Sequence, residues 1–188
     1  MIRWLWIITL WFLAACNERE MQAPLATAVA NNITEQATAL PEALADHIKT
    51  NFSQWHVVEK NDYSKTWWSF YDSSYNPCWA RTDINDDQLA DYALWLKKDN
   101  QLRLVICTGT ASHSFANYTV NDLNVPFNEK EHNLAAGIAV APPAQIDVAY
   151  PRIQSLILKS NGFALMELEE RTRIYYWENG NLQTFYTK

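Results

Sequence analysis

The residues whose types and spacing could do chemistry lie between positions 83 and 91. Side-chain oxygens stand at the first, third, fifth and ninth positions of this stretch, on Asp83, Asn85, Asp87 and Asp91. Alternate residues of a tight loop can turn inward together, and a hard cation such as Ca²⁺ takes several oxygen ligands at once. The spacing therefore predicts a calcium-binding loop. The alternative is an acidic turn that holds its own backbone through Asx hydrogen bonds and binds no metal.

The acidic loop continues into an apolar stretch from Tyr92 to Leu96, and together they resemble the calcium loop of FG-GAP (integrin-type) repeats, D-x-[DN]-x-D-G-x-x-D. This resemblance implies a backbone-carbonyl ligand from Leu89 and side-chain ligands from Asp83, Asn85, Asp87 and Asp91. Gln88 departs from the pattern, because the family has Gly there, and a side chain at positive φ costs about 1 kcal/mol or more. With the helix before the loop and a closing segment at 169–180, the chain is similar to small secreted or lipoprotein FG-GAP-like bacterial proteins. That wider resemblance implies fold and export, not an activity.

A second kind of chemistry is indicated at the N-terminus. Arg3 is followed by an apolar run from Trp4 to Phe12, and Leu13-Ala14-Ala15-Cys16 then ends the segment. The run is short for a membrane span and has the order of a secretory signal peptide. It resembles the lipobox of bacterial lipoproteins, which implies cleavage before Cys16 and acylation of that cysteine. A plain signal peptide cut nearby is the alternative.

The resemblance to lipoproteins also implies a location. The protein would be anchored to the lipid bilayer through Cys16 in the cell envelope. Asn17 is not the Asp that favours retention in the inner membrane of enteric bacteria, so the outer membrane, facing the periplasm, is expected.

The other two cysteines form an even pair. Cys78 and Cys107 would lie in an oxidising compartment, which predicts a disulfide between them. Two buried free thiols are the alternative. A catalytic thiol is disfavoured, because neither cysteine stands in a C-x-x-C pair or a recognisable nucleophile motif.

No catalytic set stands out in the remaining residues. The histidines are scattered, and neither a zinc-protease H-E-x-x-H nor a G-x-S-x-G nucleophile elbow is present. Glu167 and Glu169 resemble the paired carboxylates of glycoside hydrolases. Their position on one solvated face of a strand explains the spacing more simply. The sequence therefore predicts a non-enzymatic protein with no certain cofactor, and calcium at the acidic loop is the one candidate.

The elements that position these residues follow from the apolar pattern. Leu40, Leu44, Ile48 and Phe52 recur every four residues after Pro41, which predicts an amphipathic helix packed on a sheet. Beyond it, short strands alternate with polar turns. Hairpins are predicted around 98–101 and around Asn179-Gly180, the strongest short hairpin signal. Strands are also predicted near 55–59, 78–81, 113–120, 155–159 and 163–168. The fold class is α+β, with a mostly antiparallel sheet and one N-terminal helix after the signal peptide and tether.

The organisation is one domain behind a tether. We expect a signal peptide at 1–15, a flexible tether rich in Ala, Thr, Asn and Gln at 16–38, and a single α+β domain at 39–188. The formal net charge is −6, and removal of Arg3 with the signal leaves −7. A chain this acidic has no basic patch for nucleic acid or anionic lipid headgroups.

Three functions remain open from the sequence. The first is a membrane-anchored binding or structural module for another envelope protein or glycan. The second is a hydrolase of envelope glycan or peptide. The third is a periplasmic inhibitor of a hydrolase such as lysozyme, since a small acidic lipoprotein could bind a basic target through electrostatic complementarity. The aromatic residues from Tyr175 to Trp177, with Phe185 and Tyr186, would form either hairpin core or a recognition surface.

Overall fold

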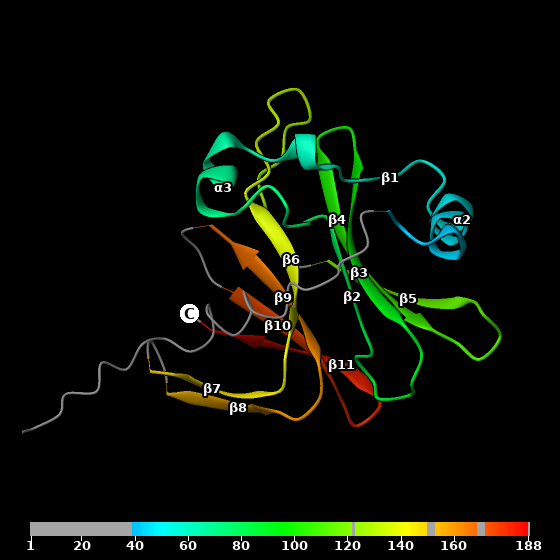
Figure 1. Cartoon of the computed structure of the whole chain (residues 1–188), viewed down its shortest axis with the longest axis vertical. Helices are drawn as coiled ribbons and strands as arrows, with labels where there is room; N and C mark the ends of the chain where they lie inside the picture. Colours follow the sequence, from blue (N-terminus) through cyan, green and yellow to red (C-terminus); the bar gives the residue numbers. More distant parts are fainter. Residues whose placement is uncertain (1–38, 122, 150–152, 169–171, 188) are drawn as a thin grey trace, which may run out of the picture.

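Two antiparallel sheets packed face to face form the body of the protein (Figure 1). The computed structural model describes residues 39–121, 123–149, 153–168 and 172–187. The predicted signal peptide, Cys16 and the predicted tether lie outside these residues. Among the described residues, no helix is long and apolar enough to cross a membrane.

The first sheet is built around one long hairpin. Strands β3 (Asp91–Lys98) and β4 (Gln101–Gly109) pair in antiparallel register, and β5 (Phe115–Val120) pairs with the far side of β4. The other edge of β3 is shared by β1 (His56–Val57) and β2 (Trp79–Thr82). The acidic loop therefore connects β2 to its own neighbour β3, at one end of the sheet.

The second sheet has the order β11-β10-β9-β6. It contains β6 (Ala136–Ala141), β9 (Gly162–Glu167), β10 (Thr172–Glu178) and β11 (Asn181–Tyr186). Strands β7 (Ala144–Val148) and β8 (Gln154–Leu158) form a separate two-stranded ribbon beside it.

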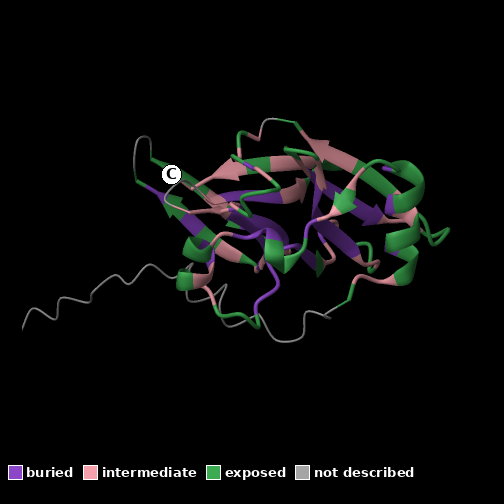
Figure 2. Ribbon diagram, turned by 90° about the horizontal axis from the view of Figure 1, so that it is seen from above, coloured by how far each residue is buried: buried purple, intermediate pink, exposed green. Residues whose placement is uncertain are grey.

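Contacts between the sheets close the sandwich on both sides. On one side, the Tyr118 ring of β5 meets the Trp177 ring of β10 edge to face, with centroids 5.4 Å apart. On the other, the backbone N–H of Ile138 in β6 donates to the Pro77 carbonyl, just before β2, at 3.0 Å. The buried residues therefore gather between the sheets and beneath the helices (Figure 2).

The predicted helix covers the outer face of the first sheet. Helix α2 (Glu42–Asn51) begins after Pro41 and buries Leu44 and Ile48, so the four-residue apolar spacing was correctly interpreted. A second helix, α3 (Lys65–Phe70), follows a short 3-10 turn, η1 (Lys60–Asp62), and packs on β6. Sequence reasoning did not predict α3, because six residues give too short a stretch for helical periodicity to show.

The fold class is confirmed: the protein is α+β, with mostly antiparallel sheets and short helices near the N-terminal end of the described chain. Both predicted hairpins form. Asn179 and Gly180 have φ of 52° and 77°, as a two-residue turn of type I′ requires. The sequence does not predict strands β6 and β7, because its prolines between 126 and 151 indicate interruptions of any long element. In the structure Pro142 and Pro143 only separate the two strands.

The two cysteines of the predicted disulfide lie apart in this fold. Cys78 and Cys107 are both free and buried. Each cysteine neighbours a different edge of β3. The Cys78 carbonyl accepts the backbone N–H of Trp95 on one edge, and Cys107 of β4 pairs with Tyr92 on the other. Strand β3 therefore lies between the two cysteines. Two strand spacings amount to about 9.5 Å, beyond the usual Cα separation of a disulfide. Tyr92 and Trp95 are an odd number of residues apart, which puts the two thiols on opposite faces of the sheet.

Neither thiol is a good nucleophile. Burial raises the pKa of both Cys78 and Cys107 to about 12, so the reactive thiolate is scarce at neutral pH. Cys107 donates to the side-chain oxygen of Asn117 at 3.3 Å, and the same oxygen lies 2.8 Å from Nε2 of His47 on α2. Asn117 thus stands between the thiol and the imidazole. These three residues join α2 to β4 and β5, and their arrangement does not activate the sulfur.

Candidate functional site

The acidic loop folds back on its own backbone. Asp83 accepts the N–H groups of Asp87 and Gln88, at 3.2 and 2.8 Å, and Asp87 accepts the N–H of Leu89 at 2.8 Å. Asn85 accepts the N–H of Asp87 and donates its amide to the second Asp87 oxygen. These are the Asx hydrogen bonds of a self-supporting turn.

Asp91 anchors the end of this loop in the interior. Its side chain is inaccessible to solvent. One carboxylate oxygen accepts the Ile84 N–H and the other accepts the Gly109 N–H, both at 2.8 Å, so the residue ties the loop to the end of β4. Burial raises the pKa of Asp91 to about 6, although the two hydrogen bonds act in the opposite direction.

Backbone strain is concentrated at two positions of the loop. Asp86 and Gln88 have φ of 59° and 68°, in the left-handed region. Gln88 therefore adopts the conformation for which the FG-GAP pattern has Gly, at the cost of strain that Gly would avoid. Asp86 is contacted by the hydroxyl of Ser160, from the segment between β8 and β9.

The side-chain oxygens of the loop are engaged in hydrogen bonds to nearby backbone N–H groups. In the part of the chain that the structure describes, no three His, Cys, Asp or Glu side chains are grouped to hold a metal. The Asn85 amide both donates to a carboxylate oxygen of Asp87 and accepts the Asp87 N–H. Calcium binding by Asp83, Asn85, Asp87, Leu89 and Asp91 stays a prediction of the sequence.

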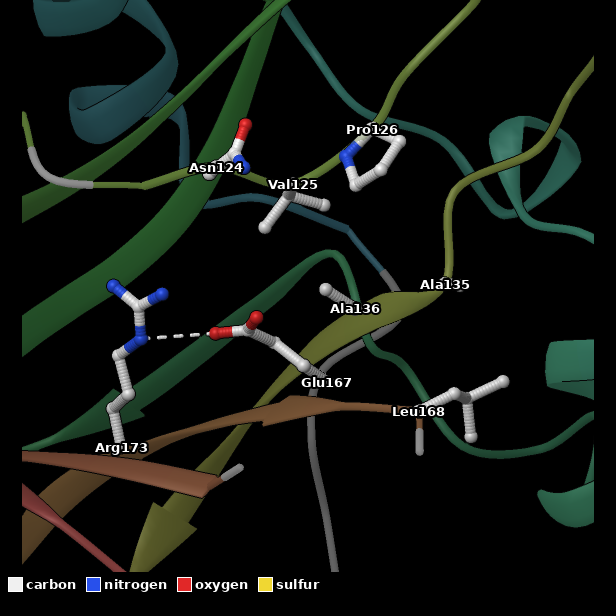
Figure 3. A pocket seen from close by; sticks show the side chains of 8 residues that line it. All are labelled: Asn124, Val125, Pro126, Ala135, Ala136, Glu167, Leu168 and Arg173. Atoms are coloured by element: carbon white, nitrogen blue, oxygen red, sulfur yellow. Dashed lines mark ion pairs between the residues drawn. The ribbon is translucent and has the colours of Figure 1, made fainter. Parts of the chain in front are cut away.

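A different feature has the form of a ligand site: a cavity of about 460 Å³ at one end of the sandwich (Figure 3). Three chain segments build it: the loop after β5, the start of β6 with the residue before it, and the adjoining ends of β9 and β10. We call it the inter-sheet cavity. Its lining consists of Asn124, Val125, Pro126, Ala135, Ala136, Glu167, Leu168 and Arg173.

Strand register explains why the charged residues of the cavity face inward. Ala136 pairs with Glu167, and Leu165 pairs with Arg173, so the strand alternation puts all four on one face of the second sheet. Trp177 lies on the same face of β10, and its ring contacts the first sheet. Glu167 and Arg173 therefore point into the space between the sheets.

Glu167 and Arg173 form an ion pair in that space. Oε1 of Glu167 lies 2.9 Å from Nε of Arg173, and the two side chains are only 11% and 9% exposed. The Arg173 guanidinium also lies 5.6 Å from the ring centroid of Tyr186, its direct neighbour on β11. Removing charges from water is costly even when they are paired, so this pair adds little stability on its own.

The ion pair corrects one interpretation of the sequence. Glu167 is not on a solvated face, because Phe163, Leu165 and Glu167 alternate on the buried face of β9. That alternation was visible in the sequence and could have placed Glu167 inside. Its partner Arg173 could not be found this way, since the pairing depends on the β9–β10 register. Glu169, the second carboxylate considered for hydrolysis, lies outside the described residues.

The other predicted functional residues do not converge on this cavity. No histidine belongs to its described lining. In the aromatic hairpin, Tyr175 is buried, while Tyr176, Trp177 and Phe185 are partly buried against the core. Their packing agrees with the core account of the hairpin.

Comparisons with known proteins add no name to this site. No protein-family model matches the chain, and neither the search of curated proteins nor the search of solved structures finds a match.

Proposed function

We propose that this protein is a lipid-anchored protein of the cell envelope whose domain binds a ligand group in the inter-sheet cavity. The anchor is Cys16, on the evidence of Leu13-Ala14-Ala15-Cys16 after Arg3 and an apolar run. The location expected from that motif is the outer membrane, facing the periplasm. The partner is another envelope component, a protein or a glycan.

The observation that carries the binding role is the enclosed ion pair in a cavity of ligand size. Pockets that hold small molecules are a few hundred Å³ or more, mostly apolar, and contain a few well-placed polar groups. The inter-sheet cavity has about 460 Å³, apolar walls from Val125, Pro126 and Ala136, and the Glu167–Arg173 pair.

The anchor is tested by metabolic labelling with a fatty-acid analogue. Wild-type protein should take up label and sediment with membranes, because several acyl chains hold a protein durably. Cys16→Ser should take up none and should either be released or accumulate as precursor. Unlabelled wild-type protein would show that the lipoprotein assignment is wrong.

The binding role is tested by co-sedimentation of the mature domain with purified envelope fragments. Val125→Trp should fill the cavity from a loop position and reduce the bound fraction. Gln145→Trp, on the exposed side of the β7–β8 ribbon, is the matched control and should bind as wild type does. Equal binding by both variants would contradict a role for the cavity.

A further inference from the structure

Two of the three large hydrophobic side chains that are exposed among the described residues belong to one short ribbon. Ile153 and Ile157 are 91% and 66% exposed, and the third is Phe70 on α3. Ile157 lies in β8 and Ile153 directly precedes that strand, at the periphery of the molecule (Figure 1). Single exposed apolar residues are common on protein surfaces, whereas apolar residues gathered in one place indicate a contact surface.

Strand β8 also has an edge to which a further strand can be added. It pairs with β7 on one side, from Gln154 with Val148 to Leu158 with Ala144, and no described strand pairs with its other side. The backbone N–H and C=O groups along such an edge can bind another chain, and natural edge strands are commonly protected by charged residues or proline. The run from Ile153 to Leu158 contains neither kind of residue.

Strand alternation puts the two isoleucines on the same face of this edge. Ile153, Ser155 and Ile157 are exposed in turn. Leu156 and Leu158 have the opposite orientation and pack against the core. Ser155 stands midway between the isoleucines, so the exposed face reads apolar, polar, apolar from either end of the strand.

A second copy of β8 complements this pattern. In an antiparallel pair with a two-fold axis at Ser155, Ile153 of each copy lies directly opposite Ile157 of the other, and the two serines face each other. Side chains directly opposed on one face contact each other, and pairs of apolar β-branched residues are favourable there. The axis also closes the assembly at two copies, because each copy contributes its β8 edge once.

We propose that the edge of β8 is an interface through which two copies of this protein pair, with Ile153 of one copy against Ile157 of the other. A contact through one strand of five residues is small beside the about 1,200–2,000 Å² of a stable complex, so the dimer is reversible and weak. The proposed acyl anchor would favour it by confining the copies to one membrane surface. The interface itself depends neither on the anchor nor on the inter-sheet cavity.

The test is sedimentation equilibrium of the mature, non-acylated chain with Cys16→Ser, over about a hundredfold range of concentration that reaches the millimolar range. The mean mass should rise from one chain to two and no further. Ile153→Lys and Ile157→Glu should each weaken the dimer at least about tenfold, because each puts a charge against an isoleucine. Phe70→Lys is the matched control, a charge at the exposed apolar residue of α3, and should dimerise as wild type does.

A double variant tests the register of the pairing. Ile153→Lys combined with Ile157→Glu places a Lys opposite a Glu on each side of the axis, so it should dimerise more strongly than either single variant. An equal mixture of the two single variants should likewise form a mixed dimer. Both positions are exposed, so the melting temperatures of these variants should stay close to that of wild type, which checks that the fold is intact.

Four results would overturn the proposal. Wild type that stays monomeric, or unchanged association of Ile153→Lys, excludes the interface. A double variant no stronger than the single ones excludes the two-fold register at Ser155. Growth of wild type beyond two copies would show an edge that aggregates instead of closing. Monomeric wild type that sediments with vesicles of phosphatidylethanolamine and phosphatidylglycerol, and loses this in Ile153→Lys, would make the ribbon a membrane contact.

Discussion

At the scale of the residue, buried polar groups decide the local structure more than the exposed ones do. Asp91 has no access to solvent, yet it holds two backbone N–H groups from segments far apart in the sequence. A buried N–H without a partner costs about 1–3 kcal/mol, so this one side chain removes two such costs. Asp91 is therefore the structural centre of the acidic loop, whether or not the exposed carboxylates meet a cation.

The raised pKa of Asp91 predicts a pH dependence of stability. Its pKa is about 6 in the fold against an ordinary 3.8, so the folded protein holds the proton more tightly than the unfolded chain. This contribution is fully present below about pH 4 and is lost as the pH rises through 6, by up to about 3 kcal/mol. Urea unfolding of wild type and Asp91→Asn at pH 4 and pH 7 checks it. The difference in unfolding free energy between the two proteins should change with pH. A constant difference would contradict the shift, and Asp46→Asn, at an exposed position of α2 away from the loop, is the control.

The hydrogen bonds of the loop predict its response to calcium. Because its carboxylates already accept local N–H groups, we expect the melting temperature to be the same in EDTA and in several millimolar Ca²⁺, with Mg²⁺ as the control for ionic strength. A working site would instead raise it by several degrees, since free ligand at a hundred times the dissociation constant adds about 2.7 kcal/mol. If Ca²⁺ alone raises the melting temperature and Asp87→Ala abolishes the rise, the calcium loop predicted from the sequence is present.

The positions of Cys78 and Cys107 predict two free thiols. A strand lies between them and they point to opposite faces, so no small adjustment can join them. Labelling of the mature protein with a thiol reagent, under denaturing and non-reducing conditions, should modify both cysteines when Cys16 is replaced by Ser. A protein that takes up label only after reduction would show that the disulfide forms.

At the scale of the element, the contact between α3 and β6 depends on a missing side chain. A Cβ at Gly137 would lie 2.4 Å from the Trp67 ring and 2.9 Å from Pro77. Trp67 is fully buried and stacks on Tyr71, with ring centroids 4.2 Å apart, so it has little room to move. Gly137 thus allows a six-residue helix to lie directly on the strand, although such a helix is too short to be stable alone.

Gly137→Ala should therefore be more damaging than an alanine at a strained turn. We expect it to cost about 1–3 kcal/mol or more through overpacking. Gly180→Ala has open space around its Cβ and a φ of 77°, so it should cost only about 1 kcal/mol of strain. Chemical denaturation of the two variants measures the difference. An equal loss of unfolding free energy in the two variants would mean that Trp67 and Pro77 shift to accommodate the added methyl group.

At the scale of the whole molecule, the two sheets and α2 share one continuous core. The buried residues of helix, first sheet and second sheet form a single cluster, with the sheets joined through Tyr118–Trp177 on one side and Pro77–Ile138 on the other. The inter-sheet cavity is a gap in that core at one end, so its shape depends on both sheets.

A domain with one core should be independent of the tether. A chain that begins at residue 39 should melt at the same temperature as the mature chain, because the described residues from 39 onward already form one continuous core. Calorimetry of the two chains provides the measurement. A lower melting temperature for the shorter chain would show that residues 16–38 contribute to the fold.

The sequence by itself determined the local elements with strong signals. The apolar spacing of Leu44 and Ile48 identified α2, and Asn179-Gly180 identified the last hairpin, because helical period and turn conformation depend on neighbouring residues. The acidic loop was located as a turn before a strand for the same reason. The proposed lipoprotein anchor also rests on a purely local signal, Leu13-Ala14-Ala15-Cys16.

Tertiary structure alone decided how these elements combine. The separation of β8 and β9 into different sheets, the position of β3 between the two cysteines, and the pairing of Glu167 with Arg173 all depend on register and strand order. Residues adjacent in the sequence can enter different sheets, and residues on different strands meet only when the chain is assembled. The inter-sheet cavity is therefore a property of the fold, and its charged pair became visible only when two strands were placed side by side.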